Sequence, residues 1–252
     1  MTDFVLVHGA WQGAWCWRRI LPALGAQGHR VFAVTLTGVG DRAHHMSPSI
    51  RLATHIDDVA AVIETEELTQ VVLVGHSYGG LLITAVADRY PQRIAHLVYL
   101  DAIVPRSGES WSSFHDESTR QARRAGIARD GAMPPLPASA FGLTGEDAAW
   151  VDRRQRPHPG GVYEDVLHFD EARVASLPRT FVDCTTPALP TISKSRVRVR
   201  SEPGWRVREI PTGHSAMISA PAQLVDILIE AARTAESPEQ WEPPPQNGAG
   251  KP

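Results

Sequence analysis

Hydrophobic positions along the chain follow two alternating patterns. Short runs rich in β-branched residues predict buried strands. These runs are residues 4–7, 31–36, 71–74, 94–100, 179–184 and 205–210. Between them, apolar residues recur every three to four positions, which predicts helices. These stretches are residues 15–27, 52–67, 81–89 and 221–234. Strands that alternate with helices are typical of an α/β protein with a mostly parallel central sheet.

The pattern changes between residues 105 and 178, where Gly- and Pro-rich stretches interrupt polar, helix-like segments and no strong strand is apparent. We interpret this region as a helical cap inserted between two parts of an α/β core, residues 1–104 and 179–235. An arginine-rich stretch at 120–129 predicts a solvated helix face in the cap. The polar, Pro-rich residues 236–252 predict a disordered tail.

The charge and the cysteine content of the chain disfavour several kinds of binding partner. The 252 residues carry a formal net charge of −3, which disfavours binding to nucleic acid or to an anionic membrane surface. The two cysteines, Cys16 and Cys184, are too few for a disulfide framework or a Cys-rich metal site, so no metal is expected. No export signal or membrane-length apolar stretch is apparent. We expect a cytoplasmic protein with a small-molecule substrate; its oligomeric state stays open, a homodimer being one alternative.

The most informative motif is Gly75-His-Ser-Tyr-Gly-Gly80, which follows an all-apolar strand and precedes a helix. It fits the G-x-S-x-G nucleophile elbow, where small residues allow a serine to project from a strained turn. We therefore predict Ser77 as a nucleophile. The backbone N–H of Tyr78 is a candidate oxyanion donor because Tyr78 is the residue after the nucleophile, and the N-terminus of the following helix favours developing negative charge.

An elbow serine needs a general base. In proteins that carry such a strand–serine–helix elbow, the catalytic histidine comes last in chain order, after the final strand. His214 occupies that place, between strand 205–210 and the last helix. The loop after the first strand, His8-Gly-Ala-Trp11, is expected to supply the second oxyanion donor from Ala10. Trp11 lies beside that donor and is a candidate lining residue of an apolar substrate pocket.

Together with residues 8–17 and 36–42, these motifs resemble the α/β-hydrolase fold superfamily. The similarity is to its carboxylesterase branch, related to plant methylesterases and hydroxynitrile lyases and to bacterial pyrethroid-hydrolysing esterases. It covers residues 3–104 well and 179–233 in layout. The resemblance implies cleavage of carboxylic esters through an acyl-enzyme, with no cofactor.

The carboxylate of the triad departs from the family pattern. Relatives usually place an aspartate in the loop after strand 179–184, but here residues 185–190 contain no carboxylate. Two candidates remain, Asp101 at the tip of strand 94–100 and Asp183 inside strand 179–184. We favour Asp101, because ligand-facing groups collect at strand tips whereas a carboxylate within a strand points into the protein.

The sequence thus predicts a serine ester hydrolase for a small to medium hydrophobic ester, aryl or pyrethroid-like esters being examples. One alternative is a hydroxynitrile lyase, although the threonine and lysine that the resembling plant lyases use are replaced by Gly9 and Ser215-Ala216. A non-catalytic or slow ligand receptor on the same fold is another alternative, which the missing family aspartate would suit.

Overall fold

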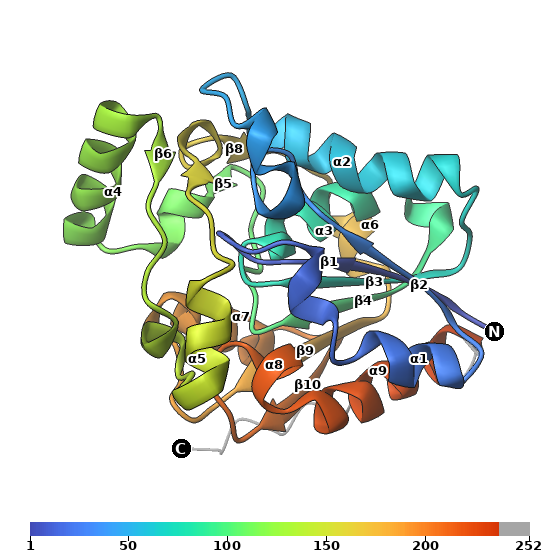
Figure 1. The fold of residues 1–252 in the computed structure, drawn as a ribbon. Coiled ribbons are helices and arrows are strands. Elements are labelled where there is room, and N and C mark those ends of the chain that lie inside the picture. The colour runs from blue at the N-terminus through green and yellow to red at the C-terminus, as the bar shows by residue number, and fades with distance from the viewer. Residues whose placement is uncertain (237–252) are drawn as a thin grey trace, which may run out of the picture.

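A six-stranded β-sheet forms the centre of the molecule (Figure 1). The structure is a computed structural model, and it describes residues 1–236. Across the sheet the order is β10 (Trp205–Ile210), β9 (Arg179–Cys184), β4 (Ile94–Leu100), β3 (Val71–His76), β1 (Asp3–Val7) and β2 (Arg30–Val34). Every neighbouring pair is parallel. The predicted α/β class and its six strands are confirmed, with small shifts at some strand ends.

Alternate residues of the strands pack into two separate hydrophobic cores. On one face, Val5 and Leu73 belong to a core that residues of four helices complete. Those helices are α2 (Leu52–Thr65), α3 (Gly79–Arg89), α6 (Glu171–Ala175) and α7 (Ser193–Ser201). On the other face, Leu6 and Val74 pack with residues of α1 (Leu21–Ala26), α8 (Ala216–Ser219) and α9 (Pro221–Glu236). Because successive side chains of a strand point to opposite faces, the near-continuous apolar runs bury both sides of the sheet.

Within residues 105–178, the segment that we interpret as a cap, α4 (Glu117–Asp130) and α5 (Gly145–Asp152) lie beyond the carboxyl ends of the strands (Figure 1). The arginine-rich helix α4 contains no fully buried residue, as the sequence predicted. The cap also contains two small antiparallel sheets, which the sequence did not indicate. They pair β5 (Glu109–Ser110) with β8 (Val166–Leu167), and β6 (Ala132–Met133) with β7 (His158–Pro159). Each strand has only two residues, too few for an alternating pattern to show.

Three other expectations need correction. The single helix predicted for residues 15–27 is wrong: a 3-10 helix spans Ala14–Trp17, and α1 begins at Leu21 with Pro22 in its first turn, where proline is tolerated. Helix α7 was not predicted, because its sequence is strongly polar. Glu236, assigned to the tail, is the last residue of α9. The rest of the predicted tail, residues 237–252, lies outside the described residues.

None of the helices within residues 1–236 combines the length and apolar character needed to cross a membrane.

Candidate active site

Ser77 lies in a sharp turn between β3 and α3. Its φ of +54° is in the left-handed region that non-glycine residues rarely adopt, the strained conformation expected of a nucleophile elbow. The turn is fastened to the segment that follows β4: Ser77 N–H donates to Leu100 O (3.2 Å), and Ile103 N–H donates to Ser77 O (3.0 Å). Ser77 is partly exposed, whereas its neighbours His76 and Tyr78 are buried.

Glycines on both sides of Ser77 permit close packing of the elbow. A Cβ atom on Gly80 would lie 2.0 Å from Ile103 O, and one on Gly75 would lie 2.7 Å from Gly79 O. Neither position has room for a side chain. The first turn of α3 can therefore lie directly against β3 and the segment after β4, which brings the serine to the carboxyl edge of the sheet.

His214 lies in the loop after β10, at the same edge. Its backbone is held on both sides: His214 N–H donates to Phe141 O (3.0 Å), and the His76 ring donates from Nε2 to His214 O (2.9 Å). The imidazole Nδ1 lies 2.7 Å from Asp101 Oδ2. Since a carboxylate only accepts hydrogen bonds, Nδ1 carries the proton and Nε2 is left as the acceptor.

Asp101 follows the last residue of β4, and it is fully buried. Its φ of +38° is held by a hydrogen bond from its N–H to Val182 O (2.7 Å) on the neighbouring strand β9. Of the two carboxylates that the sequence left open, Asp101 is the one that contacts His214.

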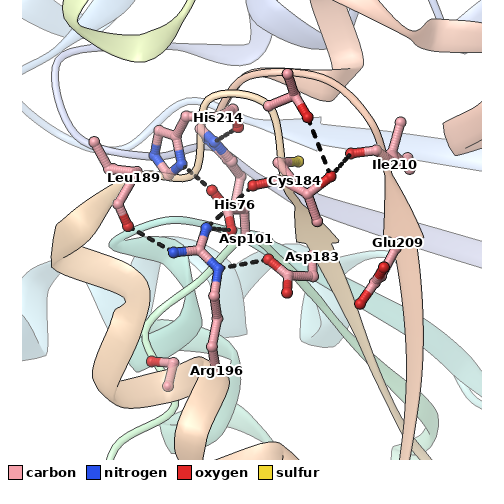
Figure 2. A network of polar contacts seen from close by, with 12 residues as sticks. His76, Asp101, Asp183, Cys184, Leu189, Arg196, Glu209, Ile210 and His214 are labelled. Carbon is pink, nitrogen blue, oxygen red and sulfur yellow. Dashed lines mark hydrogen bonds and ion pairs between the residues drawn. The ribbon is translucent and has the colours of Figure 1, made fainter.

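Asp183 is also buried, but two arginines of α7 bind it, of which Figure 2 shows Arg196. Arg196 Nε donates to Asp183 Oδ1 (2.5 Å), and Arg200 Nη2 donates to Oδ2 (2.6 Å). Arg196 Nη2 also donates to Asp101 Oδ1 (2.7 Å), so one guanidinium joins both acids. With Asp101 bound to His214 through its other oxygen, the contacts form a continuous chain from Asp183 to His214. Sequence reasoning missed Arg196; the requirement that two buried carboxylates have a nearby cation was the available signal.

The two predicted oxyanion donors also lie at this edge, after β1 and β3 respectively. Within residues 1–236, neither the Ala10 nor the Tyr78 backbone N–H donates a hydrogen bond to another group. Both donors are therefore available to a bound group. Among the described residues, 1–236, no hydrogen bond joins the Ser77 hydroxyl to His214. The distance between a catalytic serine and its histidine is often long until substrate binds.

Aromatic side chains from the core and the cap gather around Trp11, which is buried. Its ring lies 6.0 Å, centroid to centroid, from both Trp111 and Phe141. Trp111 in turn lies 4.9 Å from Tyr78. Arg123 of α4 lies over the Trp11 ring, with its guanidinium carbon 4.9 Å from the ring centroid. Arg123 therefore departs from the solvated face predicted for 120–129, because it covers an aromatic surface by a cation–π contact.

Burial keeps the neighbouring histidine neutral. Desolvation, the largest cause, and the nearby His214 hold the pKa of His76 well below its usual value. A neutral His76 that donates from Nε2 places no positive charge beside His214. The described residues contain no group of three or more His, Cys, Asp or Glu side chains placed to bind a metal ion.

A parallel sheet with a serine elbow after a central strand, and a histidine–carboxylate pair at the same edge, is the arrangement of the α/β hydrolases. Residues 4–227 match the alpha/beta hydrolase family, and the chain belongs to this family. It is a hydrolase enzyme.

Relatives extend over nearly the whole chain. A carbendazim hydrolyzing esterase of Nocardioides sp. (strain SG-4G) is 40% identical over 240 residues, which cover 90% of this chain and 98% of the relative. Esterase PIR7B of Oryza sativa subsp. japonica is 30% identical, covering 92% and 96% respectively. A solved extracellular alpha/beta-hydrolase from a Paenibacillus species superposes with a TM-score of 0.78 at 23% identity, over 92% of this chain and all of that one. The last similarity concerns the fold alone.

Proposed function

We propose that this chain is a serine carboxylic-ester hydrolase in which Ser77, His214 and Asp101 act as a triad. The observation that carries the proposal is the 2.7 Å contact between His214 Nδ1 and Asp101, at the sheet edge where the Ser77 elbow also lies. The names of the two relatives at 30% identity or more, both esterases, support the same reaction class.

The reaction begins when the Ser77 hydroxyl oxygen attacks the ester carbonyl carbon and His214 Nε2 takes the hydroxyl proton. Asp101 stabilises the imidazolium that forms. The negative charge on the carbonyl oxygen is held by the N–H groups of Ala10 and Tyr78. Collapse of the tetrahedral intermediate breaks the bond to the alcohol oxygen, which leaves with the proton from His214. Water, deprotonated by His214, then releases the acid and restores Ser77.

Arg196 supports this triad from behind. It places a positive charge 2.7 Å from Asp101 Oδ1, the carboxylate oxygen that does not contact His214. Because Arg196 also donates to the backbone oxygen of Leu189 (2.7 Å), the guanidinium is held in place and in turn fixes the position of the carboxylate. We assign Arg196 a positioning role and no contact with substrate.

The substrate class that this site favours is an uncharged, hydrophobic ester. Trp11, Trp111 and Phe141 offer aromatic surface beside the proposed oxyanion donors. Apolar groups that contact this surface gain about 25 cal/mol per Å² buried. A charged group would lose its hydration there, and Arg123 is the one cation found against these rings within residues 1–236.

The two alternatives are less well supported. A threonine side chain at position 9, as the resembling lyases use, has no room, because a Cβ on Gly9 would lie 2.9 Å from Ser77 Cβ. The receptor alternative depended on a missing acid, and Asp101 supplies a carboxylate to His214.

The decisive experiment combines labelling and turnover. A fluorophosphonate should label the wild-type protein and the exposed-serine control Ser49→Ala, but not Ser77→Ala. Hydrolysis of p-nitrophenyl esters should fall at least about 10³-fold in Ser77→Ala and stay unchanged in the control. Near-normal hydrolysis by Ser77→Ala would refute the triad. Release of cyanide from mandelonitrile with no ester hydrolysis would favour the lyase.

Substrate preference is tested by comparing kcat/KM for a hydrophobic aryl ester with that for a matched ester bearing a free carboxylate. We expect the neutral ester to be favoured by about tenfold or more, because a carboxylate is costly to desolvate. Equal values would refute the apolar-pocket proposal without affecting the triad.

A further inference from the structure

A small part of the cap fastens Trp11, the residue that follows the proposed oxyanion donor Ala10. We call it the cap ribbon and define it as residues 132–133 and 156–159, which include the paired strands β6 and β7. Trp11 N–H donates to His158 Nδ1 (3.3 Å), Trp11 Nε1–H donates to Met133 O (3.0 Å), and Arg156 N–H donates to Trp11 O (3.0 Å). Every polar group of Trp11, backbone and side chain, is thus bound to the cap ribbon.

These contacts hold Trp11 in an unfavourable backbone conformation. Its φ of +65° lies in the left-handed region, which bulky residues seldom adopt. Such conformations persist where the surrounding structure determines them, and they concentrate at functional sites. Since Trp11 is covalently joined to Ala10, fixing Trp11 also restricts the direction of the Ala10 N–H.

His158 contacts the second oxyanion segment as well. Its ring packs edge-on against Tyr78, with centroids 5.0 Å apart and planes at 75°. One side chain of the cap therefore touches both segments that carry the proposed donors: it accepts a hydrogen bond from the residue after Ala10, and it supports Tyr78 directly.

The protonation state of His158 suits this contact. The ring is fully buried, and this burial, with the nearby His55 as a smaller cause, holds its pKa well below the usual value. The neutral ring accepts at Nδ1, so Nε2 carries the proton, and within residues 1–236 that atom has no hydrogen-bond partner. A buried N–H group without an acceptor destabilises the fold, and an apolar side chain of similar size would avoid this destabilisation. The bond that the residue does make, at Nδ1, gives a reason for a histidine in this place.

We propose that His158 is a positioning residue that holds the two halves of the oxyanion hole in register. The inference rests on the proposed ester-hydrolase function, and it assigns to the cap a part in catalysis besides substrate enclosure. The contact acts where charge develops in the transition state, so its loss should lower kcat and leave KM nearly unchanged.

The test compares two substitutions of His158, one that keeps a hydrogen-bond acceptor for Trp11 N–H and one that removes it. His158→Asn can place an amide oxygen where Nδ1 now accepts from Trp11 N–H, whereas His158→Leu fills the space without an acceptor. A control, His115→Leu, alters another cap histidine, one that bonds Tyr163 OH (3.0 Å) and has no hydrogen bond to Trp11. We expect His158→Leu to lower kcat about 10- to 100-fold with KM within about twofold, the size of effect typical of a misplaced oxyanion donor. His158→Asn should recover most of this loss, and the control should keep the wild-type kcat.

An aryl trifluoromethyl ketone provides a second readout, because the Ser77 adduct carries an oxyanion. Its inhibition constant should rise in His158→Leu by the same factor as kcat/KM falls. If His158→Leu does not fold, Trp11→Phe offers a second variant: it removes the hydrogen bond to Met133 O and part of the ring, but keeps both backbone bonds to the cap ribbon. It should lower kcat by about three- to tenfold and weaken ketone binding equally. Wild-type kcat in His158→Leu, or equal losses in the Asn and Leu variants, would overturn the proposal. Retained ester hydrolysis by Ser77→Ala would instead overturn the triad on which it rests.

Discussion

The proposed role of Asp101 leads to a sharp prediction for Asp101→Asn. An asparagine amide presents one oxygen and one NH₂ group, and the two partners of Asp101 are not equivalent. Arg196 Nη2 can only donate, so the amide oxygen should face Arg196 on the Oδ1 side. The NH₂ group then faces His214 Nδ1, at the position where Oδ2 now lies 2.7 Å away. His214 is forced to accept at Nδ1 and to carry its proton on Nε2, where it cannot take the proton of Ser77.

The size of the effect follows from this tautomer reversal. In triads of this type, loss of tautomer control costs about 10³- to 10⁴-fold in kcat, which corresponds to about 4–5.5 kcal/mol of activation free energy. The assay is kcat for a p-nitrophenyl ester across pH, with active-site titration by the fluorophosphonate. Nitrogen-15 NMR of the His214 ring should show the proton moving from Nδ1 to Nε2.

Asp183→Asn is the matched control, because Asp183 is equally buried and shares the same arginine. The amide oxygen can still accept from Arg196, so kcat should stay within about tenfold of wild type while the free energy of unfolding falls. A fully active Asp101→Asn, or an inactive Asp183→Asn beside it, would refute the assignment of the acid.

His214→Ala should lower kcat about as much as Ser77→Ala, and the double variant should be little worse than either, because the residues act as one unit; multiplicative losses in steady-state kinetics would separate their roles. Arg196→Met leaves two buried carboxylates with weaker compensation, so urea denaturation should show a loss of about 3 kcal/mol in the free energy of unfolding, and no loss would contradict the ion-pair chain. Burial lowers the pKa of His8 to about 4, and the neutral ring accepts from Leu36 N–H (3.1 Å). The unfolded chain therefore binds this proton near pH 6.5 and the folded one near pH 4, so His8 alone should lower the free energy of unfolding by about 3 kcal/mol as pH drops through that window, and the buried His76 and His158 should add to the fall; increased stability on acidification would contradict this.

The parts of the site that the sequence could predict are those marked by a local motif or by their place in the chain order. Ser77 could be found because an elbow needs glycines at set positions between a strand and a helix. His214 could be found because chain order in this fold places the histidine after the last strand. The fold class followed in the same way from the regular alternation of apolar runs.

The remaining contacts depend on residues far apart in the chain. The pairing of Arg196 with Asp101 joins positions 95 residues apart, and it requires a helix whose polar sequence hid it. The contact of His158 with Trp11 spans 147 residues and depends on a two-residue strand. Neither contact leaves a periodic signal, because each is set by how the cap and α7 pack on the sheet.

The proposed acid, Asp101, lies at the tip of β4, so sequence changes in loop 185–190 do not alter the proposed triad. The segment around Asp101 is linked to the elbow through the Leu100–Ser77 and Ile103–Ser77 hydrogen bonds, so the proposed nucleophile and the proposed acid are parts of one scaffold. Loop 185–190, where resembling enzymes usually hold the acid, contains no carboxylate and therefore does not supply the acid here. Its residues can be exchanged, by evolution or by design, without removing a catalytic group, provided that Leu189 O still accepts from Arg196. The loop is therefore a natural place to diversify this enzyme while its reaction is kept.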